Sequence, residues 1–88
     1  MERYGEASKD DLSEFSRSRD WHERRKAAWN PSTSQEILQE LACDLDEQVR
    51  AAVALNSSTP KDIVKKLACD LDQSVNKAAR MRLCKEVL

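Results

Sequence analysis

The sequence of 88 residues is long enough for one domain and too short for a second hydrophobic core. Hydrophobic residues make up 40% and charged residues 35%, with one glycine and two prolines, a composition typical of helices rather than of a sandwich or barrel. Fifteen basic and sixteen acidic residues give a net charge of −1, which excludes a generally polycationic nucleic-acid binder. No apolar run approaches the roughly 18 residues of a membrane span and no signal peptide opens the chain, so we expect no membrane partner. Three cysteines are an odd number and too few for a disulfide scaffold, so we expect a reducing, cytoplasmic location.

A six-residue segment occurs twice in the chain, at a 26-residue offset. Residues 41–46 and 67–72 have the same sequence, Leu-Ala-Cys-Asp-Leu-Asp. A fainter copy precedes them at the same offset, since Phe15 aligns with Leu41 and Leu67. The pattern predicts an internal repeat. We therefore divide the chain into an N-terminal tail (1–6) and one helical-repeat domain (7–88) with units at 7–32, 33–58 and 59–84.

Each unit is predicted to begin with a short helix. Thr33 followed by Glu36 has the pattern of a capping box, in which the hydroxyl group accepts a hydrogen bond from a free helix N–H. Thr59 repeats this position, and Pro60 stands where the first helical residue would be. Apolar residues then follow at helical spacing, which places Leu41 and Leu67 in the core.

A second helix is predicted in each unit, after a tight turn. Asp20, Asp46 and Asp72 are each suited to cap its N-terminus, and Asn30 and Asn56 suit an exit through the left-handed conformation. No stretch alternates with period two, so no sheet is expected.

Three further apolar positions complete the predicted packing. Leu45 and Leu71, in the turns, are expected to fill the layer between units, and Trp29 aligns with Leu55 and Met81 as a core position. Neither helix of a unit can bury its apolar face alone, so neighbouring units must stack. The predicted fold is all-α, a short α-solenoid of about three two-helix repeats with a 26-residue period.

One whole unit resembles the leucine-rich repeat variant (LRV), a bacterial family that is similar to HEAT repeats. The residues that carry the likeness are Asn30-Pro31-Ser32-Thr33, Ile37-Leu38, Leu41-Ala42, Asp44-Leu45-Asp46, Val49-Arg50 and Ala52-Val53-Ala54. The family usually has proline between the two acids and a slightly shorter repeat, so an ordinary HEAT-like pair stays open. The resemblance implies a right-handed superhelix and no catalytic residues. Some members carry an N-terminal cysteine cluster for iron–sulfur, but here no cysteine precedes Cys43.

Cysteine and histidine usage gives no pattern of a metal or redox site. The chain has three cysteines, no Cys-x-x-Cys pair and a single histidine, His22. Cys43 and Cys69 occupy equivalent positions and are expected to be buried or half-buried structural thiols, whereas Cys84 is expected to be more exposed. The alternative is a metal-dependent or redox protein in which two chains share cysteines. We expect no cofactor.

Catalytic patterns are missing as well. No Ser–His–Asp or Cys–His arrangement can be built from the sequence, and Gly5, the only glycine, forms no phosphate-binding loop. We expect no enzyme. Trp21 aligns with Glu47 and Gln73, which are expected to face solvent, so it either covers the open end of the first unit, which we favour, or anchors a partner.

Charge is distributed unevenly along the chain. Residues 33–59 have a net charge of −4 and residues 60–88 a net charge of +3, while the first unit contains a local cluster of bases. Such a pattern is typical of a solvated face, and it can also steer a charged partner. The predicted function is a non-catalytic module for protein interaction or scaffolding. The alternative is a helical repeat that binds nucleic acid through its basic clusters.

The two ends of the domain are expected to differ. The last helix has Arg82 where the preceding unit has Asn56, so it is predicted to run on toward the terminus and to leave an apolar patch. That patch predicts self-association or partner docking through the C-terminal helix. The candidate partner-binding residues are Trp21, Arg24, Arg25, Arg80, Arg82, Lys85, Val87 and Leu88.

Overall fold

The computed structural model describes residues 16–87, with side chains through residue 84, and this part of the chain is entirely helical. Its five helices are α2 (Trp21–Trp29), α3 (Gln35–Leu41), α4 (Glu47–Leu55), α5 (Lys61–Leu67) and α6 (Gln73–Val87), and no strand occurs between residues 16 and 87. The all-α prediction is confirmed. Within the same range no helix has the length and apolarity needed to cross a membrane. The tail and most of the predicted first helix lie outside the described residues.

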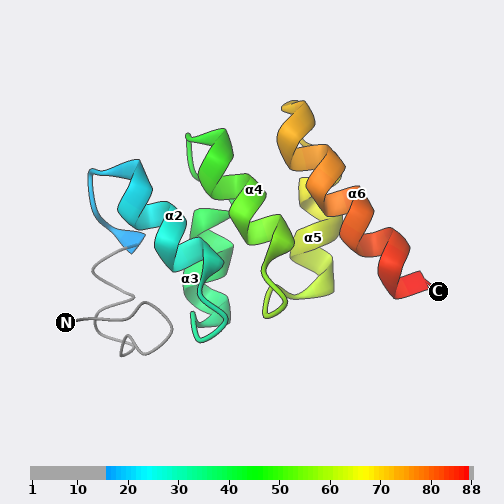
Figure 1. Cartoon of the computed structure of the whole chain (residues 1–88), viewed down its shortest axis with the longest axis horizontal. Helices are drawn as coiled ribbons and strands as arrows, with labels where there is room; N and C mark the ends of the chain where they lie inside the picture. Colours follow the sequence, from blue (N-terminus) through cyan, green and yellow to red (C-terminus); the bar gives the residue numbers. More distant parts are fainter. Residues whose placement is uncertain (1–15, 88) are drawn as a thin grey trace.

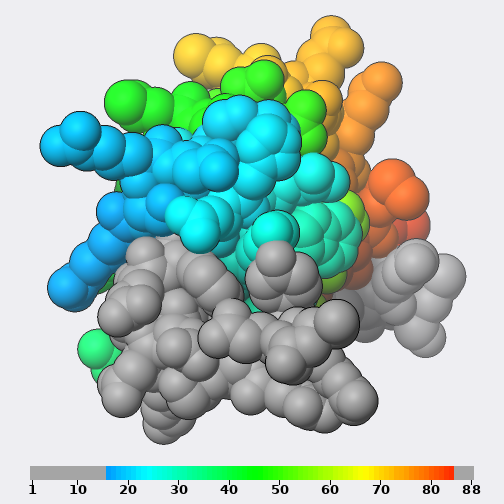
Figure 2. All heavy atoms as spheres, turned by 60° about the vertical axis from the view of Figure 1, so that its left-hand side comes forward, coloured from blue at the N-terminus to red at the C-terminus, as the bar shows by residue number. Residues whose placement is uncertain are grey.

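The helices lie in two layers. Figure 1 shows α2, α4 and α6 side by side in one row, with α3 and α5 behind them. In the row, α4 packs against both α2 and α6. Figure 2, turned toward the α2 side, shows residues of α2 as the nearest of the described helices at that end. The row therefore begins with α2 and ends with α6, and these two helices are separated by α4.

The hydrophobic core lies between the two layers. Leu41 and Leu67 are 2% and 4% exposed, so their equivalent burial is confirmed. Alanine residues on the facing helices, such as Ala52 and Ala79, are buried as well and let the helices approach closely. The largest fully buried apolar side chains are Leu38, Val49, Val53, Val64 and Val75.

Aspartate caps start the helices of the front row, as predicted. The Asp20 carboxylate accepts a hydrogen bond from the amide nitrogen of His22 at 3.0 Å. Asp46 and Asp72 accept the corresponding bonds at 2.7 and 2.9 Å. The N–H of His22 and burial act in opposite directions on the pKa of Asp20, and the hydrogen bond outweighs burial, so this pKa lies below its ordinary value.

The predicted caps of the back-row helices are wrong by one residue. Ser34, not Thr33, caps α3, and Pro60 is the cap residue of α5 rather than its first helical residue. The two threonines are buried, and their hydroxyl groups donate to carbonyl oxygens in the last turn of the preceding helix, Thr33 to Ala27 at 2.5 Å and Thr59 to Val53 at 2.6 Å. The hydroxyl groups therefore join two consecutive helices instead of capping one.

The predicted left-handed helix exits are also wrong. Asn30 and Asn56 have φ values of −75° and −73° and ψ values of 123°, which is extended backbone. No described residue has a positive φ. Each asparagine side chain instead accepts the N–H of the second following residue, Ser32 or Ser58, at 2.8 Å. This Asx turn redirects the chain without a left-handed residue.

Leu45 and Leu71 point into solvent, which contradicts the prediction that they fill the layer between units. Their exposed fractions are 96% and 100%. The reason lies in the two acids that flank each leucine. The carboxylate of Asp44 accepts the N–H of Asp46 at 2.9 Å, and the carboxylate of Asp46 accepts that of Gln48. Two successive Asx turns thus hold the loop, and the intervening leucine faces outward.

Candidate functional site

An ion pair joins α2 to the loop that precedes α4. The Nε atom of Arg24 donates to Oδ2 of Asp44 at 2.7 Å, and a terminal nitrogen donates to Oδ1 at 3.2 Å. The other terminal nitrogen donates to the backbone carbonyls of Ser18 and Arg19. Hydrogen bonding to Asp44 raises the pKa of Arg24. Although Arg24 is a predicted partner-binding residue, its guanidinium group already binds acceptors of its own chain.

The same ion pair recurs one repeat later, between α4 and the loop before α6. Arg50 donates from Nε to Oδ2 of Asp70 at 2.9 Å, and also binds the Asp44 carbonyl. Partial burial acts to raise the pKa of the Asp70 carboxyl, but the N–H of Asp72 and the Arg50 guanidinium outweigh burial, so this pKa lies below its ordinary value. The two pairs connect α2 to α4 and α4 to α6.

The Arg24–Asp44 and Arg50–Asp70 pairs form a ladder of two ion pairs across the front row, and neutral residues occupy the next equivalent position at each end. At the 26-residue offset, Ser18 corresponds to Asp44, and Asn76 corresponds to Arg50. The Ser18 hydroxyl accepts the N–H of Asp20 at 3.1 Å, and the Asn76 amide donates to the Asp70 carbonyl at 3.0 Å. Each end residue keeps the backbone hydrogen bond of its position without the charge. The ladder therefore does not extend past Asn76.

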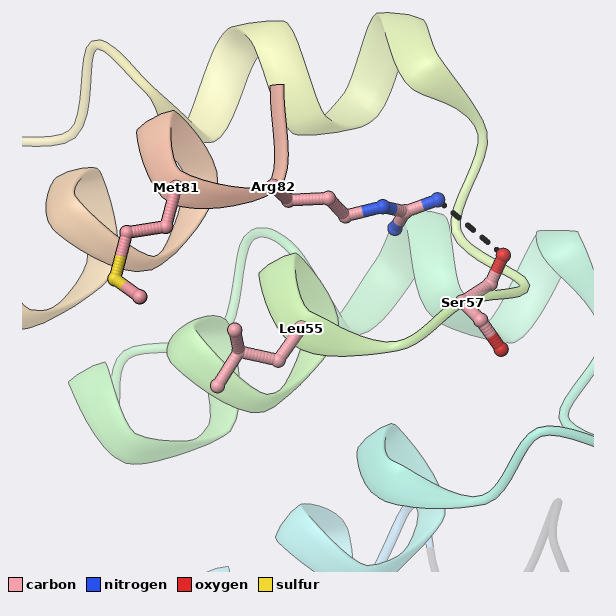
Figure 3. A pocket seen from close by; sticks show the side chains of 4 residues that line it. All are labelled: Leu55, Ser57, Met81 and Arg82. Atoms are coloured by element: carbon pink, nitrogen blue, oxygen red, sulfur yellow. Dashed lines mark hydrogen bonds between the residues drawn. The ribbon is translucent and has the colours of Figure 1, made fainter. Parts of the chain in front are cut away.

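A second polar connection joins the C-terminal ends of the front-row helices. The buried amide of Asn56 donates to the carbonyl oxygens of Ala28 and Asn30, at 2.7 and 2.9 Å. Arg82 stands at the corresponding position of α6 and donates to three carbonyls of the turn after α4, among them that of Ser57 at 3.2 Å. Figure 3 shows the Arg82–Ser57 bond. Arg82 therefore has a structural role as well.

Three exposed apolar side chains form a row across the front layer. Trp29, Leu55 and Met81, hereafter the apolar row, are 44%, 43% and 60% exposed, so the prediction of a core position for Trp29 is wrong. In α2 and α4 the core position is held by the preceding residue, since Ala28 and Ala54 are fully buried, whereas in α6 Arg80 is exposed and the buried residue is Ala79. A sequence signal was present, because the three recur at the 26-residue offset.

A cleft opens between two members of the apolar row. Figure 3 shows Leu55 on α4 and Met81 on α6 pointing to the same side, with Ser57 and Arg82 beyond them. These four residues line a cleft of about 240 Å³. Its apolar wall and its size suit an inserted aliphatic side chain.

The surroundings of the apolar row are basic. After Glu23 in α2, after Glu47 in α4 and in α6 through residue 84, no residue is acidic. Arg25 and Lys77 each precede a row residue by one helical turn, so they lie on the same face as Trp29 and Met81. The bases in these stretches are Arg24, Arg25, Lys26, Arg50, Lys77, Arg80 and Arg82.

The structure does not bring the predicted partner-binding residues into one site. Trp21 is half-buried, packs against the core and stacks on His22 with ring centroids 3.8 Å apart. Arg25 is half-buried on α2, whereas Arg80 is exposed on α6, at the other end of the row of helices. Lys85 and Val87 belong to α6, which runs on as predicted, but their side chains and Leu88 lie outside the described residues.

The cysteines are exposed, so the prediction of buried structural thiols is wrong for Cys43 and Cys69. Both follow a helix by two residues, in the turn beyond Leu41 and Leu67, where the backbone leaves the core. Among the described residues no cluster of three or more histidine, cysteine or acidic side chains could hold a metal ion.

Exposure predicts fast reaction of all three thiols. We expect a thiol reagent to modify Cys43, Cys69 and Cys84 in the native protein about as fast as in denaturant, because burial no longer limits access. Single Cys→Ser variants assign each reaction phase. A thiol that reacts only after denaturant is added would contradict the exposed placement of that cysteine.

Comparisons with protein-family models, with curated proteins and with solved structures find no match to this chain. Its function therefore has to be inferred from its own residues and geometry.

Proposed function

We propose that this chain is a non-catalytic protein-interaction module of the cytoplasm, built as a short right-handed α-solenoid of three two-helix units. The observation that carries the proposal is the apolar row of Trp29, Leu55 and Met81, together with the cleft beside it. Single exposed apolar side chains are common, but aligned ones with a charged rim are typical of interaction surfaces.

The composition of the apolar row suits a binding surface. Tryptophan is the residue most enriched among those that dominate binding energies, and methionine adapts its shape to a partner. Complete burial of a leucine or methionine contributes about 1.5–3 kcal/mol, and the row residues have roughly half of their surface left to bury. A partner that covers all three therefore gains about 2–5 kcal/mol from the apolar row, and the rest of its affinity has to come from the surrounding contacts.

The hydrogen bonds of the arginines make nucleic-acid binding the less well supported function. Arg24 and Arg82 would be natural phosphate ligands, but both guanidinium groups donate to carboxylate or carbonyl oxygens of the chain. Phosphate contacts would also make binding fall steeply with salt. If the chain binds nucleic acid with this salt dependence, and still does so after the three row residues are replaced by serine, the nucleic-acid-binding function would be favoured.

The test compares a row variant with a matched control. The row variant is Trp29→Ser/Leu55→Ser/Met81→Ser, and the control, Gln39→Ser/Lys65→Ser, changes exposed side chains of the back-row helices. We expect the parent and the control to capture a protein from a lysate of the source cells, and the row variant to bind that purified protein at least about tenfold more weakly in calorimetry. Circular dichroism shows whether each variant is folded. Equal affinity of a folded row variant would contradict the proposal.

A further inference from the structure

We propose that the apolar row binds a second copy of this chain, through the two loops that present Leu45 and Leu71. This inference rests on the protein-interaction function proposed above and names the occupant of the same surface. It is carried by three observations: the exposure of the two leucines, the opposite charges of the two surfaces, and their common 26-residue spacing.

The leucine loops, residues 43–47 and 69–73, present the most exposed large apolar side chains of the described chain. Leu45 is 96% exposed and Leu71 is 100% exposed, although the Asx turns hold both loops in a defined conformation. Each leucine therefore projects from a hydrogen-bonded loop and is left almost entirely uncovered by its own fold. A side chain of this kind is suited to insertion into a cleft of a partner.

Charge distinguishes the leucine loops from the surface around the apolar row. The loops contain five acids and no base, namely Asp44, Asp46, Glu47, Asp70 and Asp72. Two of the five are paired with arginines within the chain. Asp46 and Asp72 accept N–H groups as helix caps and keep their negative charge, and Glu47 is exposed. The apolar row, in contrast, is flanked by Arg25 and Lys77 and has no acid in the same helical stretches. The two surfaces are therefore complementary in charge.

The two surfaces also share a spacing. Leu45 and Leu71 lie one 26-residue offset apart, at the starts of α4 and α6, and the three residues of the apolar row follow the same offset across α2, α4 and α6. Because these helices lie side by side (Figure 1), both sets are spaced by the distance between neighbouring helices, about 8–10 Å. The three row residues have two gaps between them, Trp29–Leu55 and Leu55–Met81, and each gap can take one leucine of the second copy. The interval between Leu55 and Met81 is the cleft described above.

The association inferred from this match is head-to-tail. The leucine loops and the apolar row are different surfaces, so a bound pair leaves one of each unoccupied, and the interface is heterologous rather than two-fold symmetric. Exposed charges at its rim make it weaker at high salt. Assembly therefore grows with protein concentration and is limited by the affinity of a single contact.

Two variants separate the two halves of the interface. The loop variant, Leu45→Ser/Leu71→Ser, keeps the apolar row, and the short row variant, Leu55→Ser/Met81→Ser, keeps the leucine loops. In sedimentation velocity at low salt, from micromolar to millimolar concentration, we expect the average mass of the parent chain to rise, and each variant alone to stay monomeric. An equimolar mixture of the variants should form a 1:1 complex that grows no further, because each chain contributes one intact surface.

Several outcomes would overturn the inference. They are a parent chain that stays monomeric over the whole range, a loop variant that associates like the parent, and a mixture that stays monomeric although the parent associates. Circular dichroism melts verify that both variants are folded. A monomeric parent whose row variant still loses its lysate partner would overturn self-association while leaving the protein-interaction function standing.

Discussion

Replacement of Leu67 by alanine is expected to lower the free energy of unfolding by about 2–5 kcal/mol. The Leu67 side chain is 4% exposed and belongs to the core between the two layers, so its truncation removes apolar contacts and leaves a cavity. A domain of this size has a total stability of about 5–15 kcal/mol at most, so the loss is a large fraction of it. Urea unfolding followed by circular dichroism measures the change.

The chain contains its own control for this experiment. Leu71 follows Leu67 by four residues and is fully exposed, so Leu71→Ala should change the stability by no more than about 0.5 kcal/mol. Leu41 and Leu45 form the same buried and exposed pair one repeat earlier. Equal midpoints for Leu67→Ala and Leu71→Ala would contradict the placement of the core between the layers.

The framework of the fold could be predicted because it depends on local signals. Asp20, Asp46 and Asp72 cap helices through their own carboxylates, which needs only the following few residues. The burial of Leu41 and Leu67 followed from helical spacing of apolar residues. Both signals act within one or two helical turns, so the sequence displays them directly.

The outward leucines could not be predicted from hydrophobicity. Leu45 has the same side chain as Leu41, and only the Asx turns made by Asp44 and Asp46 direct it to solvent. The errors at Thr33 and Asn30 have a related cause, because each side chain has several possible hydrogen-bond partners and the partner it takes depends on how the chain turns. Residue propensities show which hydrogen bonds are possible at these positions but do not determine which one forms.

The candidate site was missed for a different reason. The 26-residue offset identifies Trp29, Leu55 and Met81 as equivalent, but an apolar position that recurs in every unit can face either the core or solvent, and these three face solvent. The ion pairs were missed because their members lie 20 residues apart and in different helix pairs. Their sequence signal is the common offset of the two arginines and the two aspartates, together with the neutral residues at both ends.

Loss of the Arg50–Asp70 ion pair is expected to have the second-largest effect on stability. The side chains are 19% and 15% exposed, and Arg50 also binds the Asp44 carbonyl, so Arg50→Ala removes hydrogen bonds to a charged group in a partly buried place. Such bonds contribute about 1.5–3 kcal/mol. The matched control is Asn76→Ala, which removes only a neutral amide bond at the end of the ladder and should cost about 0.5–1.5 kcal/mol.

The pH dependence of stability tests the contribution of the Asp70 carboxylate to the Arg50–Asp70 ion pair. The pKa of Asp70 is lower in the folded chain than its ordinary value, so its contribution is fully present above the ordinary carboxyl pKa of about 3.9 and is lost as the pH falls through the lower, folded value. Asp70→Asn removes this titration but keeps an oxygen that can accept the N–H of Asp72. We therefore expect the parent to be the more stable protein at neutral pH, and the difference in unfolding free energy to shrink as the pH falls below about 4. A difference that stays constant down to strong acid would show that Asp70 does not gain stability from its charge, and that the ladder acts through neutral hydrogen bonds alone.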